Sequence, residues 1–140
     1  LLSTGSYDRE ENIMKRTAVN TQSAPAAIGP YSQAIAVENG TVYVSGQIPV
    51  DPATGEFAGD TIEEQTEQSI KNIMAILAAN DMSIEDVVKT TVLLADMDDF
   101  AAMNKVYAEY FTEPFPARAA FEVAALPKGA KVEIEAVAVR

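Results

Sequence analysis

The feature that most constrains this fold is a shortage of helices relative to apolar strand surface. Residues 132–139 alternate so that four apolar side chains share one face, while Val137 and Val139 lie on the other. The run 87–95 is rich in β-branched residues and is also apolar on both faces. Only two segments have helical periodicity, and two helices cover one face of a sheet. Because a bare apolar face is unfavourable in water, we expect identical subunits to cover the other.

The order of the expected elements is β-β-β-α-β-α-β-β. We predict strands at 16–19, 32–37, 41–45, 87–95, 117–123 and 131–139, and helices from Thr61 to about Ala79 and from Asp96 to Pro114. Asn39-Gly40 is typical of a hairpin turn, and Thr61 with Glu64 matches a capping box. The pattern predicts one α+β domain at 16–140 with a mixed sheet of five or six strands. Residues 1–15 are interpreted as an appended leader, expected to be disordered.

The composition excludes several kinds of site. The chain has no Cys and no His, so disulfides, thiol nucleophiles and imidazole acid–base catalysis are ruled out. Its net charge of −11, from 10 basic and 21 acidic residues, disfavours nucleic-acid and anionic-membrane partners. The longest apolar run, 73–79, is too short for a membrane span. No secretory, metal-binding or cofactor-binding motif is found, so we expect a cytoplasmic protein with no metal and no cofactor.

Two charged residues in predicted strands are candidates for chemistry. Arg118 follows a proline-fixed turn and is flanked by small residues, and its planar guanidinium matches a carboxylate through two parallel hydrogen bonds. The alternative is an ordinary arginine on a surface or edge strand. Glu133 interrupts an otherwise apolar strand, and a carboxylate buried there by a neighbouring subunit would need a partner or a catalytic role. The alternative is a solvated edge position.

Three further features are weaker on their own. Tyr31 is presented by the rigid turn Gly29–Gln33, and Ser45-Gly46 ends a strand where a bare backbone would let a ligand approach its N–H groups. Asn104 lies among apolar residues of the second predicted helix. Each also fits an ordinary turn or a solvent-facing side chain.

Together these features resemble the RidA (YjgF) family of reactive-intermediate deaminases over residues 16–140. The most specific stretch is 116–126, PARAAFEVAAL, followed by Val-Glu-Ile at 132–134. The segments 26–33, AAIGPYSQ, and 45–49, SGQIP, match two other family segments in order and spacing.

The resemblance implies a chorismate-mutase-like fold, with two helices on one face and the other face buried in a homotrimer. It also implies active sites between subunits that hydrolyse 2-imino and 2-enamino acids, such as 2-aminoacrylate, to 2-oxo acids and ammonia. Carried over by position, Arg118 would bind the substrate carboxylate and Glu133 would activate water. The pocket would be lined by Tyr31, Ser45, Gly46 and Asn104. Ala120 stands where many members have Cys, so only a backbone contact is expected from it.

The main alternative is a non-catalytic protein that binds a small carboxylate as a sensor or regulator, because the same Arg118 pocket would serve it. A nuclease, an activity attached to some relatives, is disfavoured by the acidic charge and by the absence of His. The physiological imino acid and the enzyme that supplies it are not given by the sequence.

Overall fold

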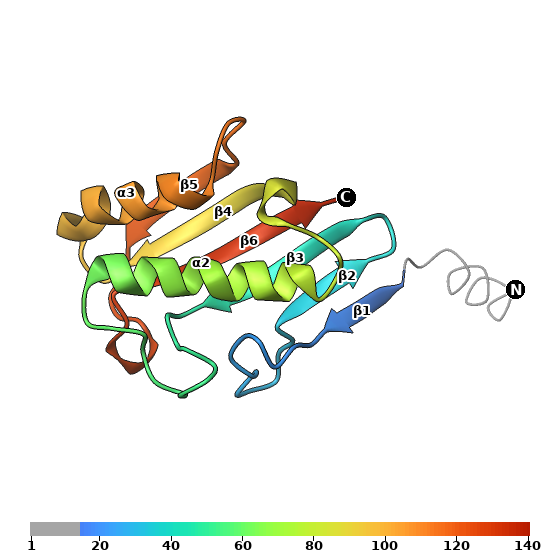
Figure 1. Ribbon diagram of the computed structural model, residues 1–140, viewed down its shortest axis with the longest axis horizontal. Coiled ribbons are helices and arrows are strands. Elements are labelled where there is room, and N and C mark those ends of the chain that lie inside the picture. Colours follow the sequence, from blue (N-terminus) through green and yellow to red (C-terminus); the bar gives the residue numbers. More distant parts are fainter. Residues whose placement is uncertain (1–14) are drawn as a thin grey trace, which may run out of the picture.

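The computed structural model describes residues 15–140, so the leader predicted at 1–15 lies outside the described residues except for Lys15. The described chain forms one six-stranded sheet and two α-helices (Figure 1). The strands are β1 Arg16–Val19, β2 Ala34–Val37, β3 Thr41–Gln47, β4 Val87–Leu94, β5 Ala117–Glu122 and β6 Val132–Val139. The helices are α2 Ile62–Ala78 and α3 Phe100–Tyr110, with 3₁₀ turns at Ile84–Asp86, Met97–Asp99 and Pro127–Gly129.

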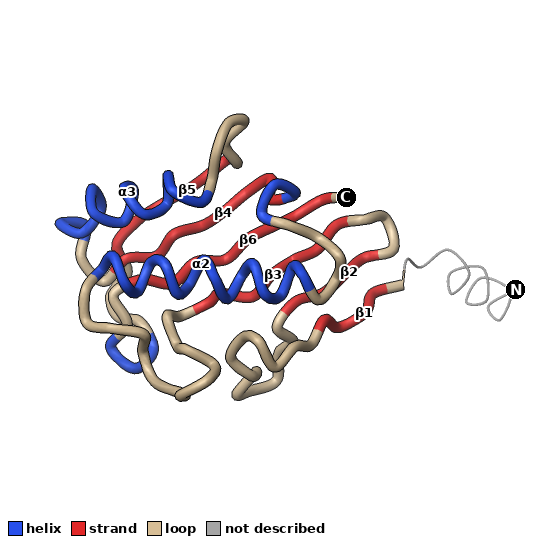
Figure 2. The backbone as a smooth tube through the Cα atoms, viewed as in Figure 1, coloured by secondary structure: helices blue, strands red, loops and turns tan. Residues whose placement is uncertain are grey.

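The last strand of the chain occupies the middle of the sheet. The strand order is β1-β2-β3-β6-β4-β5, as the tube in Figure 2 shows, and all neighbours are antiparallel except the parallel pair β4–β5. β6 therefore pairs with strands on both sides, whereas β5 is an edge strand with one neighbour. This order places Glu133 on a central strand and Arg118 on an edge strand.

Both helices lie on one face of the sheet (Figure 1). The apolar stripe of α2 includes Ile70, Ile73 and Leu77, each 0% exposed, and it packs above Val132 and Ile134 of β6, which are equally inaccessible. Burying such a side chain stabilises the fold by about 1.5–3 kcal/mol. The predicted α+β fold, a mixed sheet with two helices on one face, is confirmed.

The start of α2 follows the predicted capping box. The Thr61 hydroxyl accepts the backbone N–H of Glu64 at 3.1 Å, and the Glu64 carboxylate accepts the N–H of Thr61 at 3.3 Å. Hydrogen bonds from Thr61 hold the pKa of Glu64 below its ordinary value. These bonds satisfy N–H groups that have no partner within the helix.

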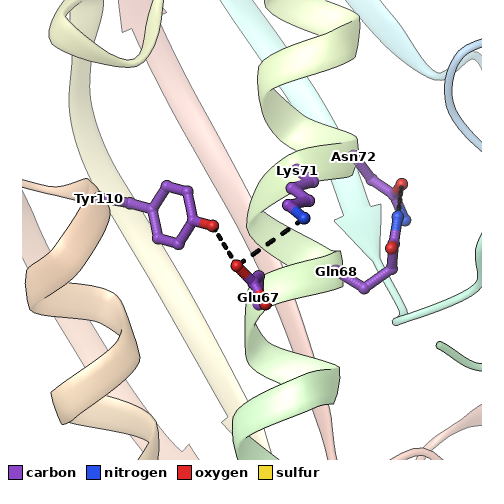
Figure 3. A network of polar contacts seen from close by, with 5 residues as sticks. All are labelled: Glu67, Gln68, Lys71, Asn72 and Tyr110. Carbon is purple, nitrogen blue, oxygen red and sulfur yellow. Dashed lines mark hydrogen bonds and ion pairs between the residues drawn. The ribbon is translucent and has the colours of Figure 1, made fainter. Parts of the chain in front are cut away.

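A polar network joins the two helices (Figure 3). The Tyr110 hydroxyl of α3 donates to the Glu67 carboxylate of α2 at 2.5 Å, and the Lys71 ammonium lies 3.8 Å from the same oxygen. Burial, followed by the hydrogen bond to Glu67, raises the pKa of Tyr110 to about 12. On the far side of α2, the buried Asn72 amide donates to the Val50 carbonyl at 2.9 Å, which ties the helix to the loop after β3.

The ends of α3 differ from the prediction. Asp96 caps the short 3₁₀ turn that precedes the helix, accepting the N–H of Asp98 at 2.8 Å, and does not cap α3 itself. The helix ends at Tyr110, short of the predicted stop at Pro114, because Phe111 turns to an extended backbone. That turn lets the Phe111 ring stack on Tyr107 with centroids 4.3 Å apart, in the core.

The face away from the helices, here called the open face, carries exposed apolar side chains. Tyr43 is 54% exposed, Phe121 48% and Val139 41%. Alternation along the strands puts them opposite the buried Val42 and Ala138. The apolar second face expected from the sequence is present, and its burial by further subunits stays a prediction.

Candidate functional site

Arg118 points towards the helices from the edge strand β5. It is in register with Thr90 of β4, which is buried on the helix side, and paired residues of neighbouring strands share a face. Its guanidinium donates to the Asn104 side-chain oxygen of α3 at 2.7 Å. The guanidinium carbon lies 4.8 Å from the centre of the Tyr107 ring and 5.5 Å from that of Phe100. The structure thus brings together Arg118 and Asn104, two of the predicted site residues.

The charge of Arg118 is not neutralised by the chain. Within residues 15–140 the only ion pair joins Lys71 and Glu67, so no carboxylate lies within 4.0 Å of the Arg118 guanidinium. Its one side-chain hydrogen bond uses a single N–H of the five that the group carries. Beside it is an open depression of about 370 Å³, lined by Asn104, Tyr107, Ala108, Phe115, Pro116 and Arg118. In a chain with twice as many acids as bases, a free guanidinium beside a depression is suited to an external anion.

Ala120 follows Arg118 by two positions on β5. It is in register with Val92, so its side chain faces the helix side and is partly buried against the core. The structure therefore places Ala120 on the same face as Arg118.

Glu133 lies on the opposite face of the sheet. It is in register with Leu93 of β4, whereas its neighbours Val132 and Ile134 face the helices. The side chain is half-buried, and its pKa is raised above the ordinary value, mainly by desolvation and secondly by repulsion from Glu135. A raised pKa makes the carboxylate a stronger base than an ordinary glutamate once it is ionised.

The absence of a side chain at Gly46 leaves room for the Glu133 carboxylate. A Cβ at residue 46 would lie 2.2 Å from a carboxylate oxygen of Glu133, a distance that no side chain tolerates. The sequence interpretation assigned the bare backbone of Gly46 to an approaching ligand. In the structure the carboxylate of Glu133 takes that space, so the glycine serves first to admit the acid, and a ligand contact at residue 46 stays a prediction.

Tyr31 and Ser45 are linked to Gly46, the residue beside this acid. Tyr31, 49% exposed, lines a small pocket with Gly46. Its hydroxyl accepts the backbone N–H of Ile28 at 3.3 Å. The Ser45 hydroxyl donates to the Ser32 carbonyl at 2.6 Å, which fixes its side chain against the turn that carries Tyr31.

The predicted site residues thus form two groups in one chain. The arginine half-site contains Arg118, Asn104 and Ala120, and the glutamate half-site contains Tyr31, Ser45, Gly46 and Glu133. Because Arg118 and Glu133 face opposite sides of the sheet, a single chain does not bring the two half-sites together.

Two aromatic neighbours of Arg118 were not identified from the sequence as parts of the site. In the sequence, Phe100 and Tyr107 are two of the apolar residues that surround Asn104 on the second predicted helix, a pattern typical of an ordinary core face. Their spacing carried a signal, because positions 100, 104 and 107 differ by four and three residues and so fall on one helix face with Asn104. Only the pairing of β5 with β4 places Arg118 opposite that face.

The described part of the chain has neither a cluster of metal-ligating side chains nor a membrane-spanning helix. Over residues 15–140, no group of three or more His, Cys, Asp or Glu side chains could hold a metal ion. Nor does either helix of this part have the length and apolar character needed to cross a bilayer.

Comparison with known proteins gives consistent results. The profile of the family described as Endoribonuclease L-PSP matches residues 21–140. The RutC family protein y4sK of Sinorhizobium fredii is 57% identical over 119 residues, 85% of this chain and 94% of that protein. The human 2-iminobutanoate/2-iminopropanoate deaminase is 51% identical over 125 residues, 89% of this chain and 90% of that protein.

A solved structure shares the fold. The structure of E. coli TdcF with bound serine has a TM-score of 0.83 and 45% identity, and the match covers 89% of this chain and 98% of that one. The fold, the two half-sites and these matches lead to one assignment: the chain belongs to the Endoribonuclease L-PSP family, which is the RidA (YjgF) family that its motifs resemble.

Proposed function

We propose that this protein hydrolyses 2-imino and 2-enamino acids, such as 2-aminoacrylate, to 2-oxo acids and ammonia. The observation that carries the proposal is the unneutralised guanidinium of Arg118, which lies beside an open depression. Five mammalian relatives at 51–54% identity over 89% of this chain are named 2-iminobutanoate/2-iminopropanoate deaminase. Identity at that level supports the same reaction class here.

Arg118 is the proposed anchor for the substrate carboxylate. Its two outer nitrogens match the two oxygens of a carboxylate, and one of these nitrogens is fixed by its hydrogen bond to the Asn104 side chain. The serine in the E. coli TdcF structure is a small molecule with a carboxylate next to a nitrogen-bearing carbon, as the proposed substrate is. Anchoring this group orients the imine carbon and reduces the entropy lost on reaching the transition state.

Glu133 is the proposed general base. Its carboxylate takes a proton from water while the water oxygen bonds to the imine carbon, whose electron pair moves to nitrogen. Glu133 returns that proton to the nitrogen, which gives a carbinolamine. The proton of the new hydroxyl then passes through Glu133 to the same nitrogen, the carbon–nitrogen bond breaks to release ammonia, and the carbon–oxygen double bond of the 2-oxo acid forms. Assistance of this kind contributes about 10²–10⁴-fold in rate.

The complete site is proposed to form between subunits of a homotrimer. Arg118 and Glu133 face opposite sides of the sheet in one chain, so a shared site requires Arg118 of one subunit and Glu133 of the next. Support comes from the exposed apolar side chains of the open face, since such surface is usually covered by a partner. A cytoplasmic location is part of the same proposal and is tested by cell fractionation.

The test also distinguishes two alternative functions. A non-catalytic carboxylate-binding protein would use Arg118 in the same way and release no ammonia. The family description names an endoribonuclease, but a net charge of −11 opposes binding of the phosphate backbone.

The test is a coupled deaminase assay on the purified protein. A pyridoxal-phosphate dehydratase generates 2-aminoacrylate from serine, and the rate of ammonia release is followed with and without the protein. We expect wild-type protein to accelerate release and Arg118→Ala to abolish the acceleration. Arg16→Ala, which removes an exposed arginine from the opposite edge strand, is the matched control and should keep the wild-type rate.

A second variant separates anchor from base. Glu133→Gln should slow turnover by about 10²–10⁴-fold while keeping affinity for a 2-oxo acid, because the base is lost and the anchor remains. Wild-type turnover in Arg118→Ala would contradict the mechanism. No acceleration by the wild-type protein, with carboxylate binding retained, would favour the regulatory alternative, and cleavage of an RNA substrate would favour the nuclease.

A further inference from the structure

Arg118 rests on an aromatic ring that is itself held in place. The Tyr107 ring is 6% exposed and lies 4.8 Å from the guanidinium carbon. Its hydroxyl is 2.8 Å from the Thr90 hydroxyl, and Thr90 is the residue of β4 that is in register with Arg118. The ring also stacks on Phe111, with centroids 4.3 Å apart. The orientation of the ring is therefore fixed by a hydrogen bond and by a stack.

The ring supports the cation without neutralising it. Burial raises the pKa of the Tyr107 phenol, an effect that outweighs the opposing influences of the Thr90 hydrogen bond and of Arg118, so the phenol stays neutral at physiological pH. A neutral aromatic face attracts a guanidinium through its quadrupole. A carboxylate at the same place would form an ion pair with Arg118 and compete with an anionic ligand. The ring gives Arg118 a defined position and leaves its charge available.

We propose that Tyr107 is a positioning residue for Arg118. Its fixed ring holds the guanidinium so that the two outer nitrogens are already oriented to bind the substrate carboxylate. This inference rests on the proposed function, because it assumes that Arg118 binds that carboxylate. An arginine side chain loses conformational freedom when it is ordered, and a ring that orders it before binding removes this cost from the binding step. Tyr107 would have the same effect on any ligand whose carboxylate binds to Arg118.

The expected kinetic signature is a rise in KM. A carboxylate contact that is equal in the ground state and the transition state affects substrate affinity more than turnover. Cation–π contacts of this kind correspond to about tenfold in affinity when they are partly desolvated. We expect Tyr107→Leu to raise KM about tenfold and to leave kcat within about twofold. Tyr107→Phe keeps the ring and should restore KM to within about threefold of wild type.

A binding experiment gives a readout that does not depend on turnover. Pyruvate, a 2-oxo acid, is titrated into wild-type protein, Tyr107→Leu, Arg118→Ala and the double variant by calorimetry. Tyr107→Leu should weaken pyruvate binding about tenfold in the wild-type background and should cause no further loss in the Arg118→Ala background. Leu77→Ala, on the buried face of α2, is the control for general destabilisation and should leave pyruvate affinity unchanged.

The wild-type protein provides a test that does not depend on how the variants fold. Protons held over the face of an aromatic ring resonate upfield, so the Nε–H and δ-proton signals of Arg118 should lie upfield of those of the exposed Arg16. Ordinary shifts for Arg118, unchanged pyruvate affinity in Tyr107→Leu, or a loss that persists in the Arg118→Ala background would overturn the role of Tyr107. Pyruvate binding and turnover that survive Arg118→Ala would instead overturn the proposed function, so the two failures are distinguishable.

Discussion

At the scale of single residues, the site depends on a glycine at position 46. Gly46 leaves the space in which the Glu133 carboxylate lies, and a methyl group there would lie 2.2 Å from its oxygen. We expect Gly46→Ala to displace Glu133 and to lower kcat towards the level of Glu133→Gln, about 10²–10⁴-fold below wild type. Steady-state kinetics on 2-aminoacrylate measures this.

A second glycine, Gly29, supplies the control for this experiment. A Cβ at Gly29 would meet only the Tyr31 ring, at 3.7 Å, which is an ordinary contact. Gly29→Ala should therefore keep activity near wild type. Full activity in Gly46→Ala would mean that the position of Glu133 seen here is not the working one.

The raised pKa of Glu133 predicts the pH dependence of the reaction. A general base works only when ionised, so kcat/KM should fall as pH drops through the pKa of this carboxyl, which burial places above the ordinary value of 4.5. Repulsion from Glu135 is the second cause of the shift, so Glu135→Gln should move the acidic limb of the profile to lower pH. Glu56→Gln, in the loop after β3, removes a carboxylate that is not among the causes of the shift and should leave the limb in place. If the acidic limb stays at the same pH in Glu135→Gln, Glu133 is not the base whose titration limits the rate.

At the scale of elements, the contact between α2 and α3 is partly polar. Tyr110 of α3 donates to Glu67 of α2, and Tyr110→Phe removes this bond with little change in shape (Figure 3). We expect the free energy of unfolding to fall by about 1 kcal/mol, because the acceptor is charged but part of the pair is solvated. Urea denaturation at pH 7 measures the loss. Tyr43→Phe, whose ring is on the open face, is the control and should cost less.

The same bond has a defined pH window. The pKa of Tyr110 is about 12 in the fold, against an ordinary value of 10.0. A proton held more tightly in the folded state stabilises it fully below pH 10, and this stabilisation is lost as pH rises from about 10 to about 12. The stability difference between wild type and Tyr110→Phe should therefore shrink over that range. A constant difference would show that the hydroxyl does not titrate in this contact.

At the scale of the whole molecule, the two half-sites require an assembly. If Arg118 of one subunit meets Glu133 of the next, the inactive variants Arg118→Ala and Glu133→Gln should complement each other when their subunits are mixed. In randomly mixed trimers about a quarter of the interfaces pair an intact arginine with an intact glutamate, so about a quarter of the wild-type rate should return. Co-expression or refolding of the mixture, followed by the deaminase assay, measures it.

The mass of the assembly checks the same inference independently. Light scattering should give three times the chain mass of 15.0 kDa. Val137→Asp places a charge on the open face and should reduce both the mass and the activity, because a buried unpaired charge is unfavourable. A fully active monomer would contradict the shared site, as would the absence of complementation at the trimeric mass.

Most elements could be predicted from the sequence because their signals are local. The Thr61–Glu64 capping box, the Asn39-Gly40 turn and the alternation of β6 each depend on residues that are close in the chain. The ends of α3 could not be predicted in this way. The helix stops at Tyr110 because Phe111 finds a place in the core against Tyr107, a contact that only the packed structure provides.

The candidate site divides along the same line. The sequence alone determined which functional groups are present: a guanidinium, a carboxylate in an apolar strand, no imidazole and no thiol. Only the tertiary structure decided that Arg118 and Glu133 face opposite sides of the sheet, that Gly46 makes room for the acid and that Tyr107 lies under the guanidinium. The physical reason is register. Alternation within a strand is a local property, but which residues of two strands share a face is set by their pairing, and pairing is a long-range contact.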